Sequence, residues 1–135
     1  MPVPFGRALG YLWALPVTLV GAGAALAARA GGARLSWREG VLEAAGGPLG
    51  PLLRRGYPPM AIAAITLGHV VLAQAQDDLD RTRVHERVHV RQFERFGPLF
   101  PLLYLGASVT ARCRGGDLYR DNWFEREARA AEGAG

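Results

Sequence analysis

Residues 83–96 have the sequence RVHERVHVRQFERF, and the centre of this segment, residues 85–89, has the form HExxH. Residues four apart lie on one face of a helix, so the imidazoles of His85 and His89 can reach one metal ion with Glu86 beside them. The chain has only three histidines, and two at this spacing favour a metal site over a solvent-facing helix with incidental histidines. We therefore predict a metal-binding helix here.

The donor types in this segment are those of a zinc site. Zinc accepts two neutral imidazoles and a carboxylate and leaves one position to water, whose pKa falls toward neutrality. Glu86 is placed to take the proton of that water. The third ligand must come from elsewhere, and residues 122–132 form a predicted short helix that offers Glu125 first, then Glu127 and Glu132. The alternative for Glu125 is a capping box with Asn122.

HERVH followed downstream by FEREA resembles the gluzincin zinc metallopeptidases, in which a later glutamate completes an HExxH site. Residues 85–92 (HExxHxxQ) and 122–128 (NxFExEA) are also similar to small bacterial membrane-associated proteins of unassigned function. The resemblance covers residues 85–129 and implies that His85, His89 and Glu125 bind zinc and that Glu86 is the catalytic base. Related membrane peptidases often have an aspartate where this chain has Arg129. The residue that hydrogen-bonds to and orients the metal-binding histidines is therefore expected to be Asp117 or Asp121, with Asn122 and Glu127 as further candidates.

Length and composition indicate one domain at a membrane surface. The chain has 135 residues, a formal charge of +4 and sixteen basic residues, all of them arginine. Arginines spread beside long apolar runs suit anionic lipid better than nucleic acid, and no nucleic-acid-binding fold is visible. The single Cys113 excludes an intrachain disulfide.

Residues 8–28 carry no charge, and 21 such residues are enough to cross a bilayer as a helix. We predict a membrane anchor over residues 1–32, with small residues at 21–28 on which another helix can pack. The alternative is a secretory signal peptide with a cleavage site near residues 25–27. The expected location is the bacterial inner membrane, and the arginines that follow the segment weakly favour a cytoplasmic carboxy-terminal part.

The middle of the chain predicts β-structure. Residues 33–45 favour one bulged strand, residues 49–59 a connecting loop, and residues 60–76 a buried strand or hairpin arm more than a second membrane span. His69 is expected to be a core histidine, and the alternative is a contact to substrate or to an oxyanion.

The helix that carries HExxH is expected to begin with an aspartate cap from residues 77–80 and to end before Gly97 and Pro98. Its arginines at 83, 87, 91 and 95 predict a solvated face, or a face on acidic lipid headgroups. Its core contacts are predicted at Val84, Val88, Val90, Phe93 and Phe96. Residues 98–109 are uncharged but short for a span, and fit a buried, re-entrant or interfacial helix.

These pieces predict an α+β fold, in which an N-terminal transmembrane helix leads to a minimal zincin-like unit over residues 33–135. In this hypothesis a peptide or protein substrate lies along the edge strand, and Tyr104 or Tyr119 stabilises the oxyanion. The expected partners are that substrate and membrane lipid. The alternative is a non-catalytic zinc-binding membrane scaffold or assembly factor.

Overall fold

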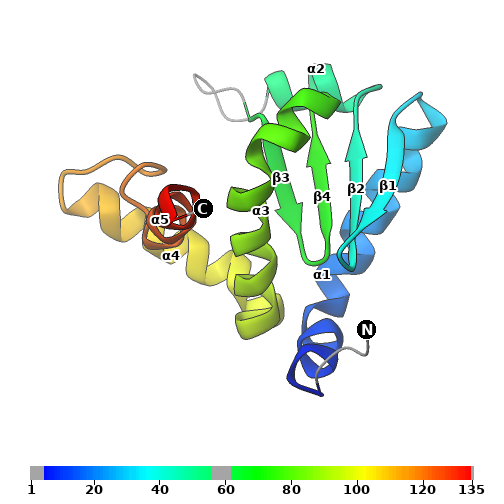
Figure 1. The fold of residues 1–135 in the computed structure, drawn as a ribbon. Coiled ribbons are helices and arrows are strands. Elements are labelled where there is room, and N and C mark those ends of the chain that lie inside the picture. The colour runs from blue at the N-terminus through cyan, green and yellow to red at the C-terminus, as the bar shows by residue number, and fades with distance from the viewer. Residues whose placement is uncertain (1–4, 56–61, 135) are drawn as a thin grey trace.

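The computed structural model describes residues 5–55 and 62–134 of the chain. They form an α+β fold with a small mixed sheet, a long N-terminal apolar helix and a group of C-terminal helices (Figure 1). The elements in chain order are α1 (Phe5–Ala30), β1 (Arg34–Arg38), β2 (Val41–Ala45), α2 (Leu49–Arg54), β3 (Ala64–Leu67), β4 (Val70–Ala73), α3 (Gln76–Phe96), the short 3₁₀ turn η1 (Gly97–Leu99), α4 (Phe100–Cys113) and α5 (Trp123–Ala134).

The sheet has the strand order β1-β2-β4-β3, so β1 and β3 are its edges. The β1–β2 and β3–β4 pairs are antiparallel and the central β2–β4 pair is parallel. Because side chains alternate along a strand, Val70 and Leu72 of β4 face a cluster with α1, whereas Val71 and Ala73 face Leu79 and other residues of α3. The sheet is therefore a layer between α1 and α3.

Helix α1 packs on the protein through its small residues. Ala14, Ala25 and Ala28 are buried, and a Cβ added at Gly21 would lie 2.9 Å from atoms of Leu67 and Val70. The small-residue face predicted to receive another helix thus receives the sheet. Helix α1 is long and apolar enough to cross a membrane, and the same features occur in signal sequences and in the core helices of soluble proteins.

Residues 33–45 form a hairpin, so the prediction of one bulged strand is wrong. Arg38 pairs with Val41 across the two-residue turn Glu39-Gly40, in which both residues have positive φ, 55° and 79°. Such turns match the twist of antiparallel strands and favour glycine. Gly40 therefore marks a tight turn between two strands and not a bulge within one strand. The β3–β4 hairpin, in contrast, agrees with the strand or hairpin predicted for residues 60–76, of which 60 and 61 lie outside the described residues.

The predicted loop over residues 49–59 contains the short helix α2, with residues 56–59 outside the described part of the chain. Leu49 and Leu53, one turn apart, are both buried in the cluster with α1 and the sheet. Tertiary burial therefore selects a helical turn despite the glycine and proline content.

Helix α3 corrects three predictions. Its N-cap residue is Ala75, with no side-chain cap, so the aspartates only occupy or follow the first turn. Val84 is 51% exposed and is no core residue, although Val88, Val90 and Phe93 are buried. The third correction concerns the arginine face, which is not solvated along its whole length.

Arg83 and Arg87 of α3 turn toward the sheet. Arg83 Nε and Nη2 lie 3.1 and 3.2 Å from the carboxylate of Glu43 on β2, and Arg87 Nη2 lies 2.9 Å from it. Glu43 is only 1% exposed, and a buried carboxylate needs opposite charges close by. Of the four arginines at 83, 87, 91 and 95, only Arg91 and Arg95, one and two turns beyond Arg87, are exposed.

The C-terminal helices close the fold around α3. Gly97 ends α3 with φ 58°, and α4 then leads away from the lower end of α3 in Figure 1. Phe93, Phe100 and Phe124 form a cluster with Ala14 of α1, so α1, α3, α4 and α5 meet there. This cluster holds α5 against the face of α3 that carries the histidines.

Candidate metal centre

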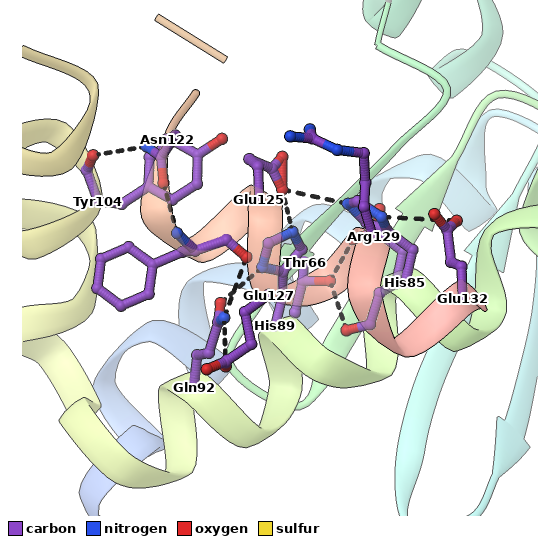
Figure 2. A network of polar contacts seen from close by, with 12 residues as sticks. Thr66, His85, His89, Gln92, Tyr104, Asn122, Glu125, Glu127, Arg129 and Glu132 are labelled. Atoms are coloured by element: carbon purple, nitrogen blue, oxygen red, sulfur yellow. Dashed lines mark hydrogen bonds and ion pairs between the residues drawn. The ribbon is translucent and has the colours of Figure 1, made fainter. Parts of the chain in front are cut away.

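Three ligand-type side chains converge between α3 and α5. His85 and His89 come from α3, and Glu125 points toward them from the first turn of α5 (Figure 2). Glu125 Oε1 lies 3.1 Å from His85 Nε2 and 2.5 Å from His89 Nε2. All three residues are buried, and one ligand atom from each lies within 4.8 Å of the others. Within the described residues this group can hold a metal ion.

The pKa values of the three side chains depend on one another, because Glu125 Oε1 contacts both imidazoles. Burial would raise the pKa of Glu125, but the hydrogen bonds and the charges of the two imidazoles hold it well below its usual value. Burial would lower the pKa of His85 and of His89, but the hydrogen bonds and the charge of Glu125 raise both. The carboxylate is therefore ionised and draws positive charge to the point where the three side chains meet.

The orientation of His89 is set by Gln92, one turn further along α3. His89 Nδ1 lies 2.8 Å from Gln92 Oε1, and Gln92 Nε2 donates to the carbonyl of Phe124 and to Glu127 Oε1. Because the Gln92 oxygen only accepts, Nδ1 carries a proton, and Nε2, which lies against Glu125, is the nitrogen that can give up its proton to bind a metal ion. This arrangement fixes the tautomer that a metal ion requires.

His85 is supported less closely, because its Nδ1 lies 3.6 Å from Glu132 Oε1, and Glu132 is partly exposed. Glu132 therefore faces the outer side of the imidazole, away from the nitrogen that meets Glu125. The predicted support from Asp117 or Asp121 is not what the structure has. Asp121 Oδ2 accepts from the Asp117 amide, and Asp117 Oδ1 accepts from the next backbone amides of the same turn.

Glu86 lies beside the group without joining it. Its Oε2 accepts a hydrogen bond of 2.6 Å from Thr66 Oγ1, on the edge strand β3. Burial raises the pKa of Glu86, while the charge of His89 and the hydrogen bond from Thr66 act in the opposite direction. A buried carboxylate with a raised pKa has the character of a general base or acid.

Two tyrosines complete the surroundings of Glu125. Burial raises the pKa of Tyr104 and of Tyr119, and the charge of Glu125 and a hydrogen bond to it raise both pKa values further. The two hydroxyls therefore stay protonated beside Glu125. The structure thus brings both predicted tyrosines to the metal group, although they come from α4 and from the turn before α5.

The remaining candidates lie outside the group. Glu127 binds Gln92, and His69 Nε2 lies 2.8 Å from Glu94 while its ring stacks on Tyr11. Asn122 accepts from the amide of Phe124, so it caps α5 without the reciprocal glutamate of a capping box. Its Nδ2 also donates to the Tyr104 carbonyl and to Ser108, which ties α5 to α4.

Sequence reasoning missed Thr66 and the role of Gln92. Gln92 lies three residues after His89, so its place on the same helix face was visible in the sequence. Thr66 lies 20 residues before Glu86 on another element, and nothing in its local sequence marks it.

Searches against protein-family models, curated proteins and solved structures found no match to this chain.

Proposed function

We propose that this chain is a membrane-associated, zinc-dependent peptidase of the gluzincin type. The observation that carries the proposal is the buried group of His85, His89 and Glu125 with Glu86 beside it. A purely structural zinc site has four protein ligands and does not need a neighbouring base. A site with three protein ligands and an adjacent carboxylate is the arrangement of a hydrolytic centre.

The fit of zinc to these residues can be judged from distances. Tetrahedral zinc with bonds of about 2.0 to 2.1 Å separates its ligand atoms by about 3.3 Å. Glu125 Oε1 lies 3.1 and 2.5 Å from the two imidazole nitrogens. Small side-chain rotations therefore suffice, and two nitrogens and one oxygen form a donor set that suits zinc. When bound, zinc polarises a substrate carbonyl and makes bound water acidic.

The chain's own residues can supply the remaining steps of hydrolysis. Glu86, held by Thr66 and with a raised pKa, takes a proton from the attacking water and delivers it to the leaving amine. Tyr104 and Tyr119 offer protonated hydroxyls next to Glu125 for the negative charge that develops on the carbonyl oxygen. His85, His89 and Glu125 hold the metal throughout.

The position of β3 supports a peptide as the substrate. It is an edge strand, and its Thr66 is bonded to Glu86. An extended peptide that pairs with the free side of an edge strand gains backbone hydrogen bonds without a deep pocket. Pairing along β3 brings its backbone close to the catalytic base.

A non-catalytic zinc-binding scaffold is the second candidate, and one observation favours it. A cavity of about 330 Å³ lies against α4 and α5, and one of about 450 Å³ lies between the β1–β2 turn and α3. Neither cavity is lined by His85, His89 or Glu125. A scaffold would use the metal for folding and needs no substrate cleft at it.

Elemental analysis of the purified protein tests the site first. We expect one zinc per chain, lost in His89→Ala and in Glu125→Gln. Glu127→Gln is the matched control, because it makes the same chemical change two residues along α5 and should keep the metal. A wild-type protein that binds no zinc, under conditions that load a known zinc enzyme, contradicts the proposal.

A library of quenched fluorescent peptides then separates the two candidates. The peptidase should cleave members of the library, and Glu86→Gln should keep its zinc but lose cleavage. Zinc-loaded wild-type protein that cleaves no more than Glu86→Gln supports the scaffold.

A further inference from the structure

The outward face of α1 carries no charge and remains uncovered by the rest of the described chain. Leu12, Leu19, Val20 and Leu26 are each between 62% and 66% exposed, on the side opposite the buried small residues. An amphipathic helix on the surface of a soluble protein places charged residues on its outer side. Here residues 8–28 contain none. Water is therefore a poor solvent for this face.

A second uncovered apolar face belongs to α4. Leu102 and Leu105 are 67% and 61% exposed, and residues 97–111 contain no charge. Helices α1 and α4 meet at one end, because Phe100 at the start of α4 shares a hydrophobic cluster with Ala14 of α1 and the ring of Trp13 lies against Gly97 just before α4. Soluble monomers rarely expose contiguous apolar patches larger than a few hundred Å².

The packing of α1 determines how it can meet a bilayer. The helix packs closely on the protein from Gly10, where an added Cβ would lie 2.9 Å from Glu94, to its end, where a Cβ on the following Gly31 would lie 2.9 Å from Pro48. Midway, Thr18 Oγ1 accepts from the amide of His69 in the β3–β4 turn. If α1 crossed a membrane in this conformation, the sheet and its charged residues would lie at the depth of the hydrocarbon. Charged residues at that depth are strongly disfavoured.

The charges around the two faces fit a lipid surface. Arg29 in the last turn of α1, and Arg112 and Arg114 at the end of α4, are exposed where the uncharged stretches stop. Arginines at the rim of an apolar face pair with anionic headgroups while the leucines enter the acyl boundary.

We propose that α1 and α4 together form a monotopic membrane-binding surface, on which the protein lies in the plane of an anionic bilayer with no segment crossing it. This inference depends on the packing of α1 and holds whether or not the metal centre is catalytic. It replaces the predicted transmembrane anchor by a helix that lies along the membrane.

Thiol labelling in membranes of expressing cells distinguishes a helix α1 that lies on the membrane from one that crosses it. In a Cys113→Ser background, Ala8→Cys and Ala30→Cys place one thiol near each end of α1, at positions exposed in the structure. We expect an impermeant thiol reagent to label both in the same preparation, either spheroplasts or inside-out vesicles. Native Cys113, which is exposed at the last position of α4, should be labelled there too in the wild type. Labelling of the two ends of α1 in opposite preparations overturns the proposal.

Vesicle flotation tests the surface itself. Leu12→Glu on α1 and Leu105→Glu on α4 should each weaken binding to anionic vesicles roughly tenfold or more. Leu52→Glu on α2 is the matched control, because Leu52 is equally exposed, at 65%, outside both faces. Circular dichroism establishes that each variant is folded. Equal vesicle binding by all three variants overturns the proposal. So does a wild-type protein that does not bind vesicles and forms a stable dimer in solution.

Discussion

Two buried carboxylates lie on opposite sides of α3 and have different partners. Glu43 is 1% exposed and faces the guanidinium groups of Arg83 and Arg87, whereas Glu125 is 2% exposed and faces the imidazoles of His85 and His89. Arginine carries its charge at every accessible pH, but a histidine does so only when protonated. The charge of Glu43 is therefore compensated permanently, while that of Glu125 needs protons or a metal ion. The first cluster serves the fold, and the second is suited to bind a cation.

Removing the charge of Glu43 should produce the largest effect. Glu43→Gln leaves Arg83 and Arg87 without their buried partner, and breaking such a pair costs about 3 to 5 kcal/mol of unfolding free energy. Glu39→Gln is the control, because Glu39 is 72% exposed and 3.8 Å from Arg87. Denaturant unfolding measures both. A cost below about 1 kcal/mol for Glu43→Gln would show that this cluster is not a structural requirement.

Metal removal should affect only the second cluster. Zinc at a hundred times its dissociation constant stabilises the folded state by about 2.7 kcal/mol, so a chelator should lower the Tm of the wild type. The Tm of Glu125→Gln should not respond, whereas Glu39→Gln should behave like the wild type. If the wild-type Tm were the same with zinc and with chelator, neither cluster would bind zinc, and the proposed metal site would be wrong.

The contribution of Gln92 sharpens the comparison within the metal cluster. Gln92→Leu removes the acceptor for His89 Nδ1, and losing such a partner typically weakens metal binding about 10- to 100-fold. Gln76→Leu, at the first position of the same helix, is the control and should leave the affinity unchanged. Competition with a chromophoric chelator gives the affinities. Equal affinities in the two variants would mean that the Gln92 contact does not orient the ligand.

The smallest expected effect on stability is at Thr66, which touches the base and not the ligands. Thr66→Val keeps the shape of the side chain but removes the hydroxyl bonded to Glu86, at a cost of about 1 kcal/mol. If Glu86 is the base, peptide cleavage should slow while the zinc content stays at the wild-type value. Thr66→Ser, which keeps the hydroxyl, should retain most of the rate. Cleavage by Thr66→Val at the wild-type rate would exclude a positioning role.

Helix α3 could be predicted from the sequence because its signals are local. A spacing of four residues places His85 and His89 on one face, and Gly97 with Pro98 ends the helix. The same local argument failed for the arginines at 83 and 87, because their periodicity defines a face but not what packs against it. Glu43 lies about 40 residues earlier, and only the folded sheet brings it there.

Of the two β-hairpins, the strands of one were predicted from the sequence and the two-strand form of the other was not. The β-branched residues of 60–76 favoured strands, which the structure has. For residues 33–45 the sequence contained a two-residue turn signal at Glu39-Gly40, and counting the residues on either side would have separated two strands from one bulged strand. Helix α2 carried no such signal, because it forms where Leu49 and Leu53 meet the core.

The sequence by itself determined which residues of α3 can act together, since helical geometry is set by contacts within a few residues and is independent of the remainder of the chain. It also determined that the chain holds long uncharged stretches, residues 8–28 and 97–111 among them, that water solvates poorly. Only the tertiary structure decided that Glu125, and not Glu127, meets both histidines, that Thr66 holds Glu86, and that α1 lies along the sheet. The physical reason is that these contacts join elements tens of residues apart, whose relative positions depend on how all the apolar faces are buried at once.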